Sequence, residues 1–189
     1  NSILTNHDRS ENDVFIDLLE DNRLILGATF HSVSITSNRL SNIESDSVEI
    51  LNTVIQNFEL RNVTIDFDLR ARGCIFGFYR ERETIVQARR KFIDNHFQKR
   101  LYYSPLRTAG ETTFTRSRFS TRFHLEGNYN QTFRFNSCDI NQDVKISHAK
   151  FDNQLRIDDG AVRGDLYITG VDISEEFILE EFTLPRKVV

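Results

Sequence analysis

Basic side chains are concentrated in one short stretch of this chain, and their chemistry can be interpreted more directly than that of any other group of residues. Seven of them lie between positions 80 and 100: Arg80, Arg82, Arg89, Arg90, Lys91, Lys99 and Arg100. Guanidinium and ammonium groups bind carboxylates and phosphates, so this cluster predicts docking of an anionic partner. An acidic protein face is the first candidate; nucleic acid is a weaker one, whose affinity would fall steeply with salt. The competing interpretation is an amphipathic element that packs on the rest of the chain and binds nothing.

The charge along the chain changes sign around this cluster. Residues 1–69 contain 4 basic and 12 acidic side chains, a net charge of −8; residues 70–122 contain 13 and 4, a net charge of +9; residues 123–189 contain 7 and 12, a net charge of −5. These values add to the overall −4. The basic middle segment is therefore the part of the sequence that most favours a binding role.

Residues suited to catalysis or metal binding do not form a recognisable pattern. The five histidines are scattered, at His7, His31, His96, His124 and His148. None has the spacing to Cys, Asp or Glu that metal sites use, and no nucleophile, phosphate-loop or metalloprotease motif is present. We therefore expect no catalytic residue, no metal and no cofactor in this chain. A catalytic domain outside it would leave that expectation intact.

Two other groups of reactive side chains have simpler explanations. Cys74 and Cys138 lack a CxxC partner, and Cys138 takes the place of an apolar residue, so both are expected to be free thiols in a reducing compartment. The acidic pairs Asp158-Asp159, Glu175-Glu176 and Glu180-Glu181 could suggest the paired carboxylates of a glycosidase. Adjacent residues of a strand point in opposite directions, so solvated corners are the favoured interpretation.

A large apolar residue returns every five positions in the first third of the chain. These residues are Ile25, Phe30, Ile35, Leu40, Ile50, Ile55, Leu60 and Ile65, with Ser45 the single break. In the last third the steps alternate between five and six: Phe135, Ile140, Ile146, Phe151, Ile157, Val162, Ile168, Ile173, Leu179 and Leu184. Neither a helix nor a flat strand repeats in this way. The spacing is typical of a solenoid whose coils stack at roughly 4.8 Å.

Residues 70–111 lack this rhythm and are expected to form an insertion. Arg80 to Leu101 is predicted to be one helix, with Ile85, Ala88 and Phe92 along its apolar face and the basic residues on the remainder. A second prediction concerns the start of the chain, where residues 1–23 would form an N-terminal cap that covers the first coil. The expected order is thus a cap over 1–23, a first β-helix block over 24–69, the basic helical insertion over 70–111, a second block over 112–184 and a tail over 185–189.

The pentads resemble those of the pentapeptide-repeat family. The recurring apolar residue is the centre of each five-residue unit, and these centres match the family well. The residue two before each centre is often apolar as well: Ala28, Val33, Ile43, Val48, Phe58 and Val63. The glycine that the family places fifth is nearly missing here. The resemblance implies an all-β fold, a right-handed, four-sided parallel β-helix, with the cap and the inserted helix as additions.

Three functions are compatible with this sequence. The first is a non-catalytic protein-interaction scaffold that docks a protein partner through a solenoid face or the basic insertion. The resemblance also suggests a DNA-mimicking protector of gyrase-type topoisomerases, as some family members are, although the +9 centre argues against it. A polysaccharide-active β-helix enzyme is the third. No apolar run reaches the roughly 20 residues of a membrane span. The absence of Met at position 1 leads us to expect a module of a larger bacterial protein, cytoplasmic or secreted into a host cell as part of an effector.

Overall fold

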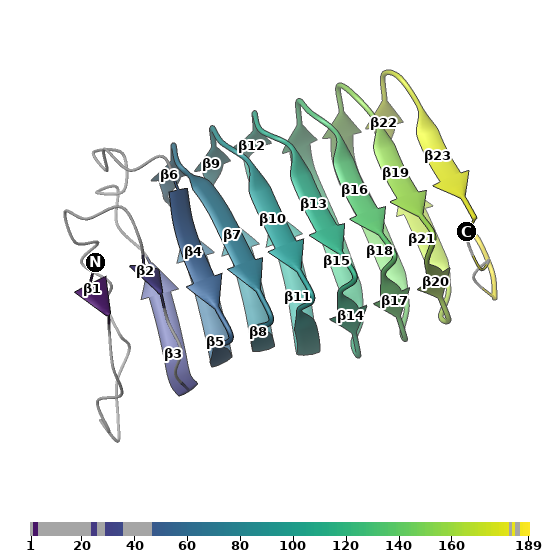
Figure 1. Ribbon diagram of the computed structural model, residues 1–189. Helices are drawn as coiled ribbons and strands as arrows, with labels where there is room; N and C mark the ends of the chain where they lie inside the picture. Colours follow the sequence, from purple (N-terminus) through teal and green to yellow (C-terminus); the bar gives the residue numbers. More distant parts are fainter. Residues whose placement is uncertain (1, 4–23, 26–28, 36–46, 182, 184–185) are drawn as a thin grey trace.

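The computed structural model describes residues 2–3, 24–25, 29–35, 47–181, 183 and 186–189, with side chains from residue 49 onward. Over these residues short parallel strands stack into a β-solenoid (Figure 1), which confirms the all-β solenoid that the repeat predicted. The expected cap over 1–23 lies outside the described residues except for Ser2–Ile3 (β1), which pairs with Leu24–Ile25 (β2).

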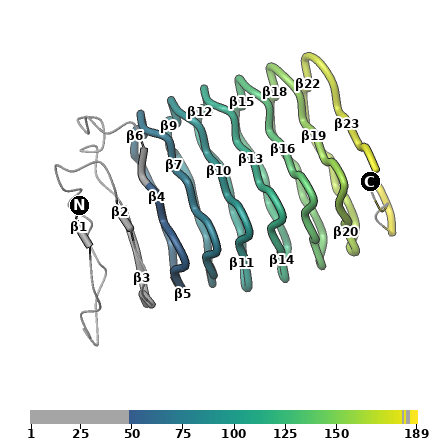
Figure 2. Tube along the Cα trace, in the orientation of Figure 1, coloured from purple at the N-terminus to yellow at the C-terminus, as the bar shows by residue number. Residues whose placement is uncertain are grey.

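One side of the solenoid is a seven-stranded parallel sheet. Its strands are β4 (Ser47–Leu51), β7 (Asp68–Arg72), β10 (Arg90–Ile93), β13 (Thr112–Thr115), β16 (Phe133–Asn136), β19 (Leu155–Asp158) and β23 (Phe177–Glu180). In-register neighbours stand at positions 50, 71, 92, 114, 135, 157 and 179, so one coil takes 21 or 22 residues. The coils follow one another along the axis in chain order (Figure 2).

The rest of each coil belongs to a fourteen-stranded sheet. Its longer strands are β3 (Thr29–Ile35), β5 (Val54–Arg61), β8 (Ile75–Arg82), β11 (His96–Ser104), β15 (Phe123–Tyr129), β18 (Val144–Phe151) and β21 (Leu166–Thr169). Its short strands are β6 (Thr64–Ile65), β9 (Ile85–Val86), β12 (Arg107–Thr108), β14 (Arg118–Phe119), β17 (Asp139–Ile140), β20 (Ala161–Val162) and β22 (Asp172–Ile173). Phe30 pairs with Ile55, 25 residues on, so the coil between β3 and β5 is longer than the others.

The core is a set of side-chain ladders that run along the inside of the tube. Phe92, Phe114 and Phe135 occupy equivalent positions in successive coils, and their rings stack with centroids 4.6 and 5.4 Å apart. Phe76, Phe97 and Phe119 form a second stack, at 5.2 and 4.9 Å. Stacked aromatic pairs add to the stabilisation that burial provides, and these two ladders contain six of the 16 phenylalanines of this chain.

The helix predicted over Arg80–Leu101 is wrong, because this segment forms β8, β9, β10 and β11 and adds coils to the solenoid. The five-or-six rhythm in fact continues, with buried residues at Ala71, Phe76, Glu81, Val86, Phe92, Phe97, Tyr103, Thr108, Phe114 and Phe119. Two of these positions hold polar residues, Glu81 and Thr108. The buried Arg90 precedes another of them, Phe92, by two residues. These three residues hid the apolar pattern.

One corner of every coil uses a left-handed backbone conformation. At this corner the residues with positive φ are Asn52, Gly73, Asp94, Arg116, Ser137, Asp159 and Glu181, again 21 or 22 apart. Glycine, asparagine and aspartate tolerate this conformation best, and they occupy four of these seven positions. After five of these corners the next residue is buried, namely Thr53, Cys74, Asn95, Ser117 and Cys138, so both cysteines occupy this position. Cys74 and Cys138 are free and buried, as expected.

The later coils follow the predicted register with two corrections. Tyr129, not Asn130, is the buried residue at its corner, with 1 % of its surface exposed. The predicted tail is partly ordered by pairing, because Leu166 donates its N–H to Lys187 O and accepts that of Val189. Burial weakens toward this end, where Leu179 is 38 % exposed.

Candidate functional site: a basic and aromatic groove

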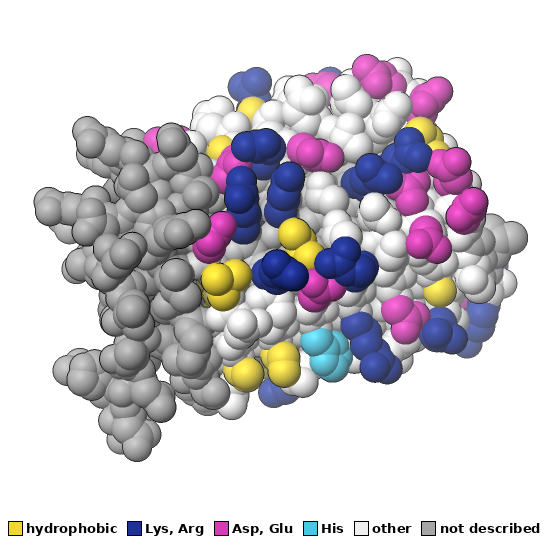
Figure 3. Space-filling view, in the orientation of Figure 1, with side chains coloured by type: hydrophobic (Ala, Val, Ile, Leu, Met, Phe, Trp, Pro, Cys, Tyr) yellow, Lys and Arg dark blue, Asp and Glu magenta, His cyan; other side chains and the backbone are white. Residues whose placement is uncertain are grey.

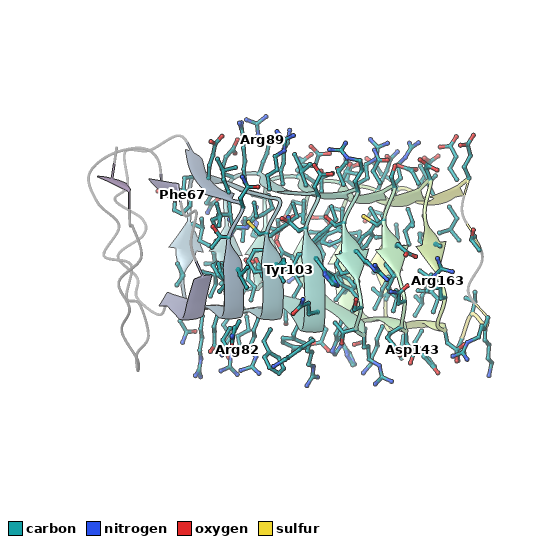
Figure 4. The ribbon with its side chains drawn as sticks, turned by 60° about the horizontal axis from the view of Figure 1, so that its bottom comes forward. Phe67, Arg82, Arg89, Tyr103, Asp143 and Arg163 are labelled. Carbon is teal, nitrogen blue, oxygen red and sulfur yellow. The ribbon has the colours of Figure 1, made fainter. Side chains whose placement is uncertain are left out.

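The seven basic residues that the sequence singled out do not form one surface. Arg80 and Arg82 lie on β8, and Lys99 and Arg100 on β11. Arg89 precedes β10, and Lys91 lies within it on the seven-stranded sheet. Arg82 and Arg89 point away from opposite sides of the tube, with Tyr103 between them (Figure 4). Arg90 is fully buried in the core, so the predicted set divides into two surfaces and one interior residue.

Most of the positive charge of residues 70–122 is neutralised by neighbouring coils. Stacking brings residues 21 or 22 apart into contact, so cations of one coil meet carboxylates of the next. Seven of the thirteen cations have such a partner, namely Arg70, Arg72, Arg80, Arg82, Arg89, Arg116 and Arg122. An eighth, Arg90, pairs with Glu81 of its own coil. Five form no salt bridge among the described residues: Lys91, Lys99, Arg100, Arg107 and Arg118. The net charge of a segment therefore overstates what its surface offers.

The outer face of the seven-stranded sheet shows this neutralisation most clearly. Asp94 accepts a bidentate hydrogen bond from Arg116, at 2.7 and 2.9 Å, and lies 3.8 Å from Arg72. Farther along, Asp158 lies 2.6 Å from both Arg134 and Arg156. Figure 3 shows blue and magenta side chains intermixed over this face. A face of paired charges has little left to offer a charged partner.

A groove on the opposite sheet is different. It has a volume of about 290 Å³ and is lined by side chains of β5, β8 and β11: Asn57, Phe58, Glu59, Phe78, Tyr79, Arg80, Arg100 and Tyr102. Phe78 is 41 % exposed, although the phenylalanines of the core are fully buried. The groove thus combines an exposed aromatic ring with two arginines.

A β-bulge in β11 shapes this groove. Phe76 pairs with Phe97 and Phe78 with Arg100, so Gly77 alone faces both Gln98 and Lys99. A bulge inserts one extra residue and turns neighbouring side chains. Here it leaves Gln98, Lys99 and Arg100 exposed in succession, and it lengthens the coil between β8 and β11 from 21 to 22 residues.

The cations of the groove are only partly neutralised. Arg80 and Arg82 share one carboxylate, Glu59, at 3.6 and 3.1 Å. Arg100 forms no salt bridge within the part of the chain that the structure describes. The ammonium of Lys99, which is likewise without a carboxylate there, lies over the Phe78 ring, 5.1 Å from its centroid. An anionic ligand in the groove would therefore meet available positive charge beside an aromatic surface.

Tyr102 is held in place by a polar cluster at a second bulge, between β15 and β18. Its hydroxyl donates to Glu126 Oε2 at 2.8 Å, and the His124 ring meets its own ring edge-on at 5.0 Å. Burial raises the pKa of Glu126, but hydrogen bonds from Tyr102 and Ser147 lower it, and the net effect is a lowered pKa. The carboxylate therefore stays charged. Burial also raises the pKa of Tyr102, aided by Glu126. The tyrosine therefore remains a protonated donor with a fixed orientation.

The same cluster brings Ser147, His124 and Glu126 together without forming a nucleophilic triad. His124 Nε2 lies 3.0 Å from Ser147 Oγ and 2.9 Å from Glu126 Oε1, so one ring nitrogen makes both contacts. In a triad the two ring nitrogens serve the nucleophile and the acid separately. Ser147 is moreover only 1 % exposed, which keeps its hydroxyl from a substrate.

A buried ion pair lies inside the tube next to the groove. Glu81 and Arg90 are both fully buried, with Glu81 Oε1 3.4 Å from Arg90 Nη2. Tyr79 and Thr84 donate to the same carboxylate at 3.0 and 2.9 Å. Burial lowers the pKa of Arg90, but Glu81 together with Tyr103 and Tyr79 more than offsets this, so the arginine stays charged. Burial and the charge of Glu81 together raise the pKa of Tyr79 well above its usual value.

Four of the six carboxylates of the acidic pairs have structural partners, among them Glu176, which accepts a hydrogen bond from Gln154 at 3.2 Å. Asp158 is bonded to Arg134 and Arg156, Asp159 accepts from Ser137 at 2.9 Å, and Glu180 pairs with Arg156 at 2.6 Å. No cluster of three or more metal-binding side chains occurs among the described residues. That part of the chain also contains no helix long and apolar enough to cross a membrane.

Sequence reasoning found the arginines of the groove and missed the ring beside them. Had the rhythm been followed through Phe76 and Glu81, Phe78 would have stood at an outward position, where its ring is available to a ligand. That was the available signal. Nothing in the sequence could locate the bulge.

Comparison with protein-family models, with curated proteins and with solved structures finds no match for this chain.

Proposed function

We propose that this chain is a non-catalytic interaction module that docks an acidic protein segment in the groove between β5, β8 and β11. The observation that carries the proposal is Arg100, an exposed guanidinium without a carboxylate partner in the described structure, beside the exposed ring of Phe78. Most other cations of the basic segment are already paired, so the groove is where positive charge remains for a partner. The wall of a rigid solenoid would hold these groups in place before binding, which lowers the entropic cost of association.

The finer description of the fold belongs to the same proposal. The five-or-six rhythm supports a right-handed, four-sided β-helix related to the pentapeptide-repeat proteins, with divergent repeats. A module of a larger bacterial protein, cytoplasmic or delivered to a host cell as part of an effector, fits an interaction role.

The two alternatives have less support. A DNA mimic needs a continuous acidic surface, whereas Asp94 and Asp158 are each covered by two arginines. A glycosidase needs two carboxylates free to act on one bond, whereas Asp158 and Glu180 are engaged with Arg156. An undiminished gyrase supercoiling activity in the presence of the protein would remove the first alternative.

The test is a binding titration with a fluorescein-labelled peptide rich in Asp and Glu, followed by anisotropy. Arg100→Glu is expected to weaken binding at least tenfold, because it replaces an attraction by a repulsion at the same place. Lys91→Glu is the matched control, since Lys91 also lacks a carboxylate partner but lies on the other sheet. Equal affinity of Arg100→Glu and the parent protein, or equal weakening by Lys91→Glu, would contradict the proposal.

A further inference from the structure

The size of the groove limits what can enter it. At about 290 Å³ it lies at the lower end of the roughly 300–1,000 Å³ that small-molecule sites occupy. It has room for one large side chain of a partner and not for a folded element. Recognition there would consist of a single anchor, with flanking groups outside.

The walls of the groove favour an aromatic anchor. Phe78 offers an exposed ring on β8, and Tyr102 lines the same groove from β11. Tyr102 is fixed by its hydrogen bond to Glu126 and by its contact with His124, so its ring is in place before a ligand arrives. Aromatic side chains pair favourably in stacked or edge-on arrangements.

The cations at the rim favour acidic neighbours for that anchor. Arg100 forms no salt bridge within the described chain, and Arg80 shares Glu59 with Arg82. A carboxylate of the ligand could accept a bidentate hydrogen bond from Arg100 without displacing an existing partner.

A long polyanion fits this surface less well than a short acidic segment. Nucleic acid binding uses a row of cations that follows the phosphates. On the sheet that carries the groove, Glu59 precedes Arg80 in register, and Tyr102 and His124 separate Arg80 from the next cation of that row, Lys145. The positive charge is therefore local, on a chain whose net charge is −4.

We propose that the groove recognises an aromatic side chain flanked by carboxylates, with Phe78 and Tyr102 holding the ring and Arg100 an adjacent carboxylate. This inference rests on the proposed function and adds its specificity.

The absence of tryptophan from this chain allows a direct test. Three peptides of one length are titrated: an acidic peptide with a central Trp, the same peptide with Ala in its place, and a Lys-rich peptide with the Trp. Trp fluorescence reports the two Trp peptides without background, and calorimetry compares all three. The acidic Trp peptide is expected to bind at least tenfold more tightly than either of the others.

Variants separate the two parts of the site. Phe78→Ala is expected to reduce the affinity for the Trp peptide to that of the Ala peptide and to leave the latter unchanged, whereas Arg100→Glu weakens both acidic peptides. Leu106→Ala, at another exposed apolar residue (56 %), is the control and should change neither. Matching circular dichroism spectra and unfolding midpoints show that each variant is folded.

The contrary outcomes are distinct. Equal binding of the Trp and Ala peptides would overturn the aromatic anchor and leave the acidic docking site standing. No binding of any acidic peptide would overturn both. Tighter binding of a single-stranded oligonucleotide, lost in Arg100→Glu, would overturn both in favour of nucleic acid.

Discussion

The buried pair of Glu81 and Arg90 is the most unusual feature of the core, and it predicts a strong non-additivity. In register with Glu81 are Leu60 and Tyr103, and in register with Arg90 are Leu69 and Thr112. Both charges therefore occupy positions where neighbouring coils carry mostly apolar or uncharged side chains. Removal of one charge leaves the other buried and unpaired, which typically costs about 3–5 kcal/mol.

The two single variants should lose different amounts of the free energy of unfolding. Glu81→Leu leaves the guanidinium of Arg90 without its acceptor, and Nε and Nη1 already have no partner among the described atoms, so a loss of about 4 kcal/mol is expected. Arg90→Leu leaves a carboxyl that can take up a proton and keep its contacts with Tyr79 and Thr84, so the loss is expected to be smaller, about 3 kcal/mol.

The double variant removes both charges at once. It strands the hydroxyls of Tyr79 and Thr84, at about 1 kcal/mol each, but it buries two leucines, each worth roughly 1.5–3 kcal/mol. The double variant is therefore expected to be within about 2 kcal/mol of the parent protein. The two single losses together exceed the double loss by a coupling energy of about 5 kcal/mol or more.

Urea unfolding followed by tyrosine fluorescence measures this directly, because the chain has five tyrosines and no tryptophan. Tyr79 and Tyr103 lie beside the pair and report on the right coils. Arg122→Leu is a control, since its exposed pair with Asp143 should change the free energy of unfolding by less than about 1 kcal/mol. A coupling energy under about 1 kcal/mol would refute the interpretation of this site.

Four further predictions concern stability and reactivity. Ile157→Asp places a carboxylate at a position that is 2 % exposed and should cost about 4 kcal/mol or more; a normal thermal midpoint would mean that the core register is wrong. Gly127→Ala should cost about 2 kcal/mol or more in urea unfolding, because its φ is +105° and a Cβ would come 2.0 Å from a backbone oxygen of the neighbouring coil; unchanged stability would contradict that geometry. Cys74 and Cys138 should resist a thiol reagent in the folded protein, because burial raises both thiol pKa values, that of Cys138 to about 12; rapid modification of either thiol under native conditions would argue against burial. Burial lowers the pKa of His124, so folding favours its neutral form and stability should be lost as the pH falls below about 6.5. His124→Gln should flatten that part of the pH profile of the thermal unfolding midpoint. A steeper profile in the variant would mean that the effect has the opposite sign.

The spacing of apolar residues along the sequence was enough to determine the solenoid. A residue buried at every fifth or sixth position can face one interior only if the chain turns regularly, and stacking then pairs the backbone between coils. Polar corner residues such as Asn52 and Asp94 mark where a left-handed turn is tolerated. These features are local, so the sequence alone could predict them.

Tertiary contacts decided the rest. Arg90 was predicted to lie on the exposed face of a helix, because a charge can be buried only when its partner is buried with it. Its pairing with Glu81 depends on how the coil closes. The +9 segment looked like an exposed basic element, but stacking placed carboxylates of neighbouring coils beside seven of its cations. The groove depends on the bulge at Gln98 and Lys99, which leaves Arg100 beside an exposed Phe78. Each of these is a relation between neighbouring strands or coils, and such relations are fixed by packing in space and not by spacing along the chain.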